Sequence, residues 1–136
     1  MPTPSASPTP NAPVVLVAED DPEIRSMLVR ALGSKYTVYE ARNGKEAHEI
    51  IAAIPAPAAL VCDWMMPEMS GIQLVRRLRK DPALSRIPVL ILTAKSTVQD
   101  VANGINAGAR HYMTKPFKLA ELMAKVDSMV AKKQKG

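Results

Sequence analysis

Acidic, hydroxyl and basic side chains follow four short apolar segments of the chain, at the point where each segment ends. Three carboxylates, Glu19, Asp20 and Asp63, come from two of these points, and Thr93 and Lys115 come from the other two. A carboxylate can attack phosphorus and form an acyl phosphate if the repulsion between the anions is neutralised, which a metal cation and a lysine would do. These residue types are therefore suited to phosphoryl transfer, provided that the fold brings the four points together.

The apolar segments alternate with longer segments of helical periodicity, and they recur after roughly 20 to 30 residues, the spacing of βα units. We expect five parallel strands alternating with five helices. The predicted strands are Val14–Ala18, Tyr36–Ala41, Ala59–Asp63, Pro88–Thr93 and Arg110–Met113. Such units with right-handed crossovers make a doubly wound, three-layer α/β domain whose ligands bind beyond the carboxyl ends of the strands. The acids, Thr93 and Lys115 all fall on that edge.

Residues that cap helices mark several of the predicted helix starts. A capping residue stands three positions before a Glu or Gln at Asn43 and Glu46, Ser70 and Gln73, and Ser96 and Gln99. Asp21 followed by Pro22 fits an N-cap with proline at the first helical position. Asp21 is thereby assigned to helix capping and not to the acidic site.

Length and composition favour one folded domain with a tail. The 136 residues fit a single domain. Residues 1–13 are rich in Pro, Ser, Thr and Ala, a composition that predicts a disordered N-terminal tail, so we expect the domain to span residues 14–133. Cys62 is the only cysteine, which excludes an intramolecular disulfide and favours a reducing compartment.

The formal net charge of +5 comes partly from the terminal run Lys132, Lys133 and Lys135. Aromatic residues for base stacking are scarce, so we interpret this charge as solvated surface and expect no direct binding of nucleic acid. No apolar stretch approaches the length of a membrane span, and the N-terminus lacks the pattern of a secretory signal. We therefore expect a cytoplasmic protein that does not bind membranes.

Three carboxylates that converge in a partly dry site need a cation. An all-oxygen ligand set suits magnesium, for which manganese can substitute. Zinc is disfavoured because His48 and His111 lie far apart in the sequence and have no cysteine partners.

Four motifs together resemble the response-regulator receiver domains of two-component signalling, the CheY-like family. They are VLVAEDDP at residues 15–22, LVCDWMMPEMSG at 60–71, VLILTA at 89–94 and YMTKPF at 112–117. Their order and spacing, over residues 14 to about 131, carry the resemblance. It implies a flavodoxin-like sheet with strand order 2-1-3-4-5, and a domain that switches conformation when it is phosphorylated.

The resemblance also implies roles for the acidic residues. Glu19 and Asp20 match the family's acidic metal pair, and Asp63 matches the phosphoacceptor and third acid. The backbone carbonyl of Met65 would complete the protein's share of the magnesium shell.

The remaining motif residues match the family's switch and lysine positions. Thr93 matches the switch hydroxyl, and Tyr112 the aromatic residue whose rotamer reports activation. Lys115 matches the lysine that pairs with the acceptor and then with the phosphoryl group. The Lys115–Pro116 peptide bond would be cis.

By the same resemblance, Asp63 would receive its phosphoryl group from a histidine kinase or a histidine phosphotransfer protein. The output would be a separate protein partner or an output domain missing from this sequence, with homodimerisation on phosphorylation as a common habit of the family. The domain would promote its own phosphotransfer and dephosphorylation without acting as an enzyme on other substrates.

Two other function classes stay open at this level. An aspartyl-phosphate phosphohydrolase of the haloacid-dehalogenase kind would want a second aspartate where this chain has Met65. A receiver-like scaffold that is never phosphorylated would not need the intact set of acids, Thr93 and Lys115. The sequence names neither the cognate kinase nor the output.

Overall fold

The computed structural model describes residues 2–94 and 98–135. Five parallel strands form one sheet in the order β2-β1-β3-β4-β5. In chain order, the elements are β1 (Val14–Ala18), α1 (Pro22–Leu32), β2 (Thr37–Ala41), α2 (Gly44–Ala53), β3 (Ala59–Asp63), α3 (Gly71–Lys80), β4 (Val89–Thr93), α4 (Val98–Asn106), β5 (His111–Thr114) and α5 (Leu119–Lys135). The predicted doubly wound fold and strand order are confirmed.

The bounds of β1 and β3 match the predicted strands, and the other three strands start one residue later than predicted. The amide of Tyr36 donates to the carbonyl of Leu32, so Tyr36 belongs to the turn after α1. Pro88 has no N–H to give to a neighbouring strand, and β4 therefore starts at Val89. Local hydrogen bonding at the strand starts explains the first two of these shifts.

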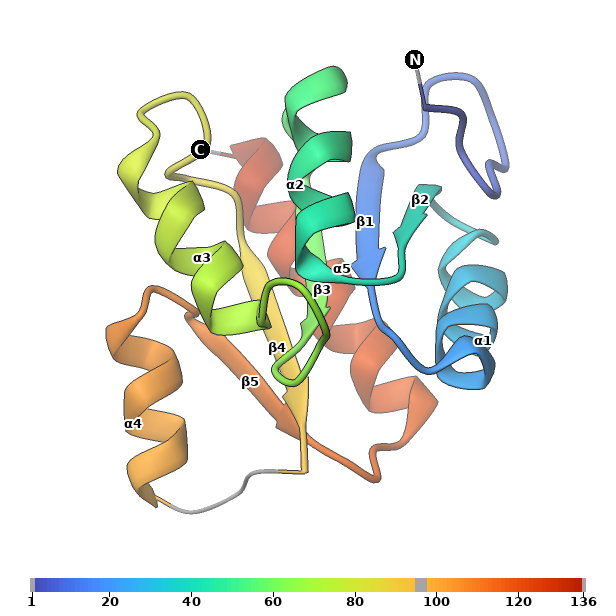
Figure 1. The fold of residues 1–136 in the computed structure, drawn as a ribbon. Helices are drawn as coiled ribbons and strands as arrows, with labels where there is room; N and C mark the ends of the chain where they lie inside the picture. Colours follow the sequence, from blue (N-terminus) through green and yellow to red (C-terminus); the bar gives the residue numbers. More distant parts are fainter. Residues whose placement is uncertain (1, 95–97, 136) are drawn as a thin grey trace.

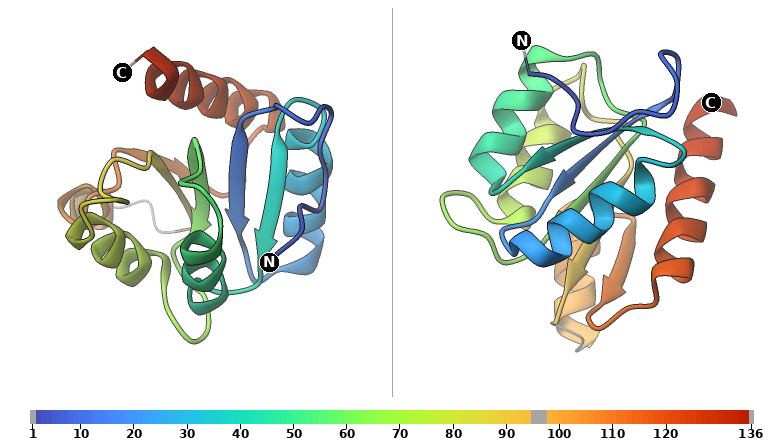
Figure 2. Two further views of the ribbon diagram at one scale, coloured as in Figure 1. Left: turned by 90° about the horizontal axis from the view of Figure 1, so that it is seen from above. Right: turned by 90° about the vertical axis from the view of Figure 1, so that its right-hand side faces the viewer.

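The helices cover both faces of the sheet (Figures 1 and 2). Helices α1 and α5 pack on one face, and α2, α3 and α4 lie on the other. Side chains of a strand alternate between the two cores: Val15 and Val17 point to the α1 and α5 side, while Leu16 and Ala18 point to the opposite side. Burial on both faces is the reason why the strands are apolar throughout instead of alternating with polar residues.

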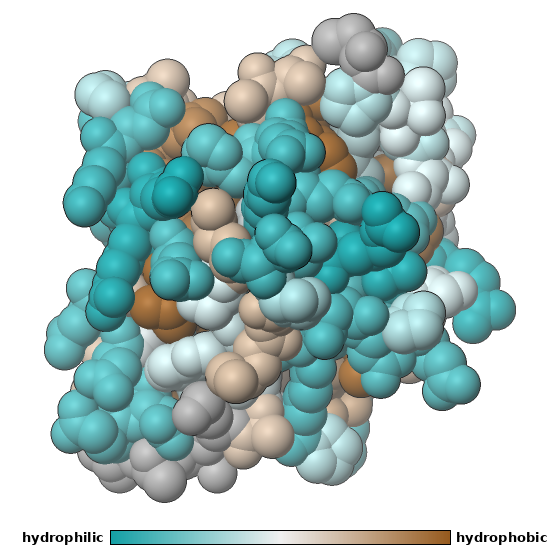
Figure 3. Space-filling model, in the orientation of Figure 1, coloured by the Kyte–Doolittle hydropathy of each residue, from teal (hydrophilic) through white to brown (hydrophobic). Residues whose placement is uncertain are grey.

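The surface over α2, α3 and α4 is largely hydrophilic, and hydrophobic residues show there only in small separate areas (Figure 3). Among the described helices, none combines the length and apolar character that crossing a bilayer requires.

Helix capping follows the prediction at three of the four marked starts. Asp21 accepts hydrogen bonds from the amides of Glu23 and Ile24 at the start of α1. Ser70 and Gln73 form a complete capping box on α3, and Asn43 accepts from the amide of Glu46 on α2. The predicted cap at Ser96 lies outside the described residues. The caps on α1 and α3 fix the starts of the next helices after Asp20 and Asp63 in the chain.

Part of the N-terminal tail lies beside the edge strand β2. Ala6 forms an isolated antiparallel bridge with Val38. The amide of Val38 donates to the carbonyl of Ala6 at 2.8 Å, and the amide of Ser5 donates to the carbonyl of Val38 at 2.7 Å. A Cβ atom at Gly33 would lie 2.5 Å from the Cβ of Ala6, so the missing side chain makes room for Ala6. Disorder of residues 1–13 and the domain bounds 14–133 stay predictions, which these contacts make testable.

Deleting residues 1–11 is expected to speed hydrogen exchange of the Val38 amide by about tenfold, because this amide loses its acceptor and faces water on an edge strand. Exchange would be followed residue by residue by NMR. The amide of Leu60, which donates to Pro88 inside the sheet, is the internal control. Equal exchange at Val38 in both proteins would show that the tail does not pair with β2 in solution.

Candidate functional site

The predicted site residues meet at the carboxyl ends of the strands, toward the lower edge of the view in Figure 1. Three backbone hydrogen bonds tie the chain together there, just beyond the ladder of the sheet. They are Glu19 N to Ala41 O (3.0 Å), Trp64 N to Leu92 O (3.0 Å) and Lys115 N to Thr93 O (2.8 Å). The strand-end residues are therefore held to their neighbours by main-chain bonds and not by side-chain contacts alone.

The three acids converge at this edge, and one lysine reaches two of them. Glu19, Asp20 and Asp63 each offer a carboxylate oxygen, and the three oxygens lie within 4.8 Å of one another. The ammonium of Lys115 donates to Glu19 Oε1 at 2.7 Å and to Asp63 Oδ2 at 3.2 Å. The structure thus brings together side chains that stand at or just after the ends of β1, β3 and β5, up to 96 positions apart in the chain.

Two carboxylates of this cluster are buried, which strengthens the interactions between its charges. Glu19 is 1% exposed and Asp63 is 7% exposed. Burial raises the pKa of Glu19, the adjacent Asp63 carboxylate raises it further, and Lys115 opposes both, so that the pKa of Glu19 reaches about 8. Burial alone would lower the pKa of Lys115, but the hydrogen bond to Glu19 and the charge of Asp63 raise it overall. The Lys115 ammonium stays charged, and the repulsion between the two carboxylates favours protonation of Glu19.

The cluster suits a hard divalent cation. All of its donor atoms are carboxylate oxygens, which such cations prefer. Asp20 is exposed, so a cation at this position could keep part of its water shell. One ammonium cannot balance three carboxylates, and an added cation would restore the ionised form of Glu19.

Asp63 is held by the turn that follows β3. Its Oδ1 accepts from the amide of Met65 at 3.4 Å, and the amide of Gly71 donates to the carbonyl of Trp64 at 2.9 Å. A Cβ atom at Gly71 would lie only 2.2 Å from the carbonyl oxygen of Asp63. The start of α3 can therefore approach the acidic residue this closely only because Gly71 has no side chain.

Thr93 and Tyr112 occupy neighbouring strands. Thr93 ends β4 and is 2% exposed. The half-buried ring of Tyr112 meets the ring of Trp64 edge to face, with centroids 6.1 Å apart and planes at 84°. A Cβ atom at Gly104 would lie 3.3 Å from the Tyr112 ring, so α4 also borders this aromatic pair.

Two other sequence predictions concern the segments after β3 and β5. The Lys115–Pro116 peptide bond is cis, as the resemblance implied. Met65 is 61% exposed, and the role of its backbone carbonyl as a metal ligand stays a prediction.

One residue that positions the site was not identified from the sequence. The guanidinium of Arg25 donates to the backbone carbonyl of Glu19 at 2.9 Å and to that of Asp20 at 3.5 Å. The same side chain forms an ion pair with Glu40 at 3.1 Å. Arg25 thereby fixes the turn between β1 and α1, but no pattern in the sequence marks a contact between α1 and the end of β2.

Comparison with known proteins agrees with this geometry. A family model described as the response regulator receiver domain matches residues 15–127. The phosphate regulon transcriptional regulatory protein PhoB of Pseudomonas aeruginosa is 38% identical over 117 residues, which cover 85% of this chain and 51% of PhoB. The response regulator MprA of Mycobacterium ulcerans is 41% identical over 117 residues, which cover 85% of this chain and 49% of MprA. The chain thus spans about half the length of these relatives.

A receiver domain of known structure shares the fold of this chain. The receiver domain of the sensor histidine kinase PA1611 from Pseudomonas aeruginosa has a TM-score of 0.80 and 27% sequence identity, over 88% of this chain and 98% of that domain. Its crystal structure has a magnesium ion coordinated in the active-site cleft.

Gly71→Ala is expected to destabilise the protein by about 1–3 kcal/mol, because the added methyl group collides with the Asp63 backbone. Urea unfolding measures this change. Gly104→Ala is the matched control, since the nearest atoms are those of the Tyr112 ring at 3.3 Å, which can yield, and alanine favours a helix. If the two variants were equally stable, the close approach of α3 to Asp63 would not constrain the site.

Proposed function

The chain belongs to the response-regulator receiver domain family of two-component signalling, and from this we propose that Asp63 is its phosphoacceptor. The observation that carries the proposal is the contact of the Lys115 ammonium with both Glu19 and Asp63. This contact supplies the positive charge that an anionic nucleophile needs when it approaches a phosphoryl group.

In the proposed reaction, a carboxylate oxygen of Asp63 attacks the phosphorus of a phosphohistidine on a histidine kinase or a histidine phosphotransfer protein. A new O–P bond forms and the N–P bond breaks, with its electron pair returning to the imidazole. The product on this chain is an acyl phosphate, and attack by water later releases inorganic phosphate. Lys115 then pairs with the phosphoryl oxygens instead of the free carboxylate.

Glu19, Asp20, Asp63 and the backbone carbonyl of Met65 would hold a magnesium ion, or manganese in its place. When bound, the ion supplies positive charge that offsets the repulsion between Asp63 and the incoming phosphoryl group. The all-oxygen cluster of three acids supports this assignment. The chain's own role is to bring its carboxylates together, and Arg25 and Lys115 fix their positions.

Thr93 and Tyr112 form the proposed switch. Phosphorylation draws the Thr93 hydroxyl toward the new oxygens, and Tyr112 turns inward from its present contact with Trp64. The change shifts a pre-existing equilibrium on the face made by α4, β5 and α5. That face would bind an output partner or a second copy of the chain.

The whole protein's output is a further proposal. Because the chain spans about half of its regulator relatives, its signal would pass either to a separate protein or to an output domain outside this sequence. The receiver domain itself would not bind nucleic acid or membranes, and it would work in the cytoplasm, where its single buried cysteine stays reduced.

Incubation with acetyl phosphate and magnesium is expected to add the mass of one phosphoryl group to the wild-type chain. Asp63→Asn removes the nucleophilic carboxylate, so it should gain nothing. Intact mass spectrometry measures both results.

Two further samples complete this test. Asp127→Asn, which changes an acid on α5 outside the cluster, should be phosphorylated like the wild type. If the wild type gained no mass with any small phosphodonor, the chain would be an unphosphorylated scaffold. A gain that persisted in Asp63→Asn would move the acceptor to another residue.

Magnesium affinity is expected to fall by roughly tenfold or more in Asp20→Asn, because one of three carboxylates is lost. Trp64, the chain's only tryptophan, follows Asp63 directly, and its fluorescence reports the titration. Asp21→Asn is the matched neighbour: Asp21 caps α1, asparagine can replace it there, and magnesium affinity should not change. Equal affinities of the two variants would contradict the proposed ligand set.

A further inference from the structure

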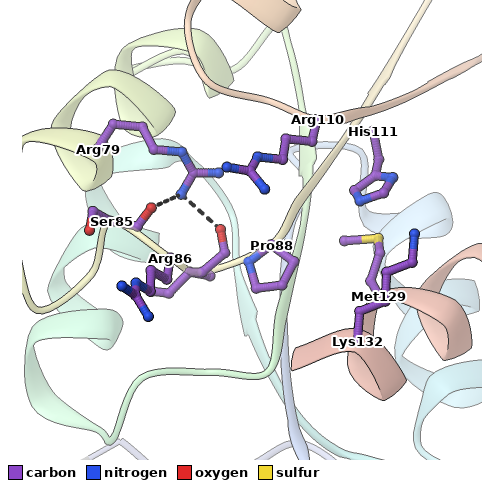
Figure 4. Close-up of a pocket in the computed structure, with 9 residues that line it drawn as sticks. Arg79, Ser85, Arg86, Pro88, Arg110, His111, Met129 and Lys132 are labelled. Carbon is purple, nitrogen blue, oxygen red and sulfur yellow. Dashed lines mark hydrogen bonds between the residues drawn. The ribbon is translucent and has the colours of Figure 1, made fainter. Parts of the chain in front are cut away.

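A cavity lies at the opposite end of the sheet from the acidic cluster, where β4 and β5 begin (Figure 4). The cavity has a volume of about 420 Å³. Its lining comes from the end of α3, the segment before β4, the start of β5 and the last turns of α5. The lining residues are Arg79, Ser85, Arg86, Ile87, Pro88, Arg110, His111, Met129 and Lys132.

The charged side chains that line this cavity are all basic. Four of its lining side chains are Arg or Lys, a fifth is His111, and no carboxylate lines it. Within residues 2–94 and 98–135, Arg86, Arg110 and Lys132 make no ion pair and no side-chain hydrogen bond. Three cations from three separate segments of the chain thus surround the cavity without a counter-charge.

Arg79 forms a fixed wall of the cavity. Its guanidinium donates to the carbonyls of Gly108 (2.8 Å), Ile87 (2.8 Å) and Ser85 (3.0 Å), so carbonyl dipoles alone offset its charge. The guanidinium of Arg110 points toward that of Arg79 (Figure 4). Burial lowers the pKa of Arg79, and the charge of Arg110 lowers it further. The two like charges therefore repel each other, a repulsion that a bound anion would relieve.

The positive charges around the cavity also act on His111. Burial lowers the pKa of His111, and the positive charges of Lys125, Lys132 and Arg110 lower it further. The ring and the Lys132 ammonium lie on the same side of the cavity in Figure 4. An anion between these groups would oppose this effect.

The cavity also has an apolar part. Ile87 and Met129 are each 1% exposed and contribute to its lining together with Pro88. A volume of about 420 Å³ lies in the range of small-molecule sites. Guanidinium groups match phosphate oxygens with paired hydrogen bonds, while the apolar part offers contact to an organic body.

We propose that this cavity binds a small phosphorylated organic molecule, of the size of a nucleoside diphosphate. The phosphates would lie between Arg86, Arg110 and Lys132, and the organic body against Pro88, next to the buried Met129. This site is separate from the Asp63 cluster, because its residues stand at the amino ends of β4 and β5. It does not depend on the phosphoacceptor function proposed above.

The test is an NMR titration of the full chain, labelled with ¹⁵N and with ¹³C at methionine methyl groups, in EDTA so that the acidic cluster holds no divalent cation. The probes are ADP, pyrophosphate and citrate. We expect ADP to shift the signals of His111 and Met129, with a dissociation constant below about 1 mM. Pyrophosphate should bind more weakly because it lacks the organic body. Citrate should bind more weakly than both, because its carboxylates do not have the geometry of a phosphate group.

Arg86→Ala combined with Arg110→Ala is expected to weaken ADP binding at least tenfold. Both side chains are exposed and unpaired, so the double variant should fold, and Arg79 is left intact because it ties three segments together. Arg30→Ala, which removes an exposed charge from α1, should bind ADP like the wild type.

Three results would overturn the proposal. One is the absence of shifts at His111 and Met129 with millimolar ADP. Another is binding that persists in the folded double variant. The last is a response to a short DNA duplex at far lower concentration than to ADP, which would make the cavity part of a nucleic-acid surface.

Discussion

One ammonium group joins the ends of three strands. Lys115 follows β5, and its hydrogen bonds reach Glu19 after β1 and Asp63 at the end of β3. Without this positive charge, two buried carboxylates would face each other in a site where water cannot screen them. The main-chain bond from Lys115 to Thr93 keeps the lysine at this point and connects the charge cluster to β4. The proposed nucleophile Asp63, the acid Glu19 and the proposed switch residue Thr93 are therefore all linked to Lys115.

The parallel sheet is what makes such a cluster available. All five strands run in one direction, so every strand delivers its carboxyl end to the same edge, and helices on both faces leave that edge as the open place. Close approach of the helix starts completes the site: Gly71 lets α3 lie against the Asp63 backbone, and Arg25 on α1 holds the carbonyls of Glu19 and Asp20. The packing of α1 and α3 therefore also positions the acidic residues.

The two ends of the sheet carry opposite charge. Carboxylates gather at the carboxyl ends of β1 and β3, whereas Arg and Lys gather at the amino ends of β4 and β5. The net charge of +5 therefore does not describe an evenly basic surface. Thr93 stands at the far end of β4 from the basic cavity, and Tyr112 on β5 directly follows His111 of the cavity lining, so the two sites share the strands that carry the proposed switch.

The sequence by itself determined the fold class and which residues form the acidic site. The family resemblance added the strand order. Val14–Ala18 and Ala59–Asp63 could be placed to the residue because burial on both faces makes such strands continuously apolar. Glu19, Asp20, Asp63 and Lys115 could be grouped because parallel strands end on one edge. Only the tertiary structure decided that Arg25 holds the acidic turn, that Ala6 lies beside Val38, and that Arg79 and Arg110 face one cavity. These contacts join residues whose spacing follows no helical or strand period, so they exist only in the folded chain.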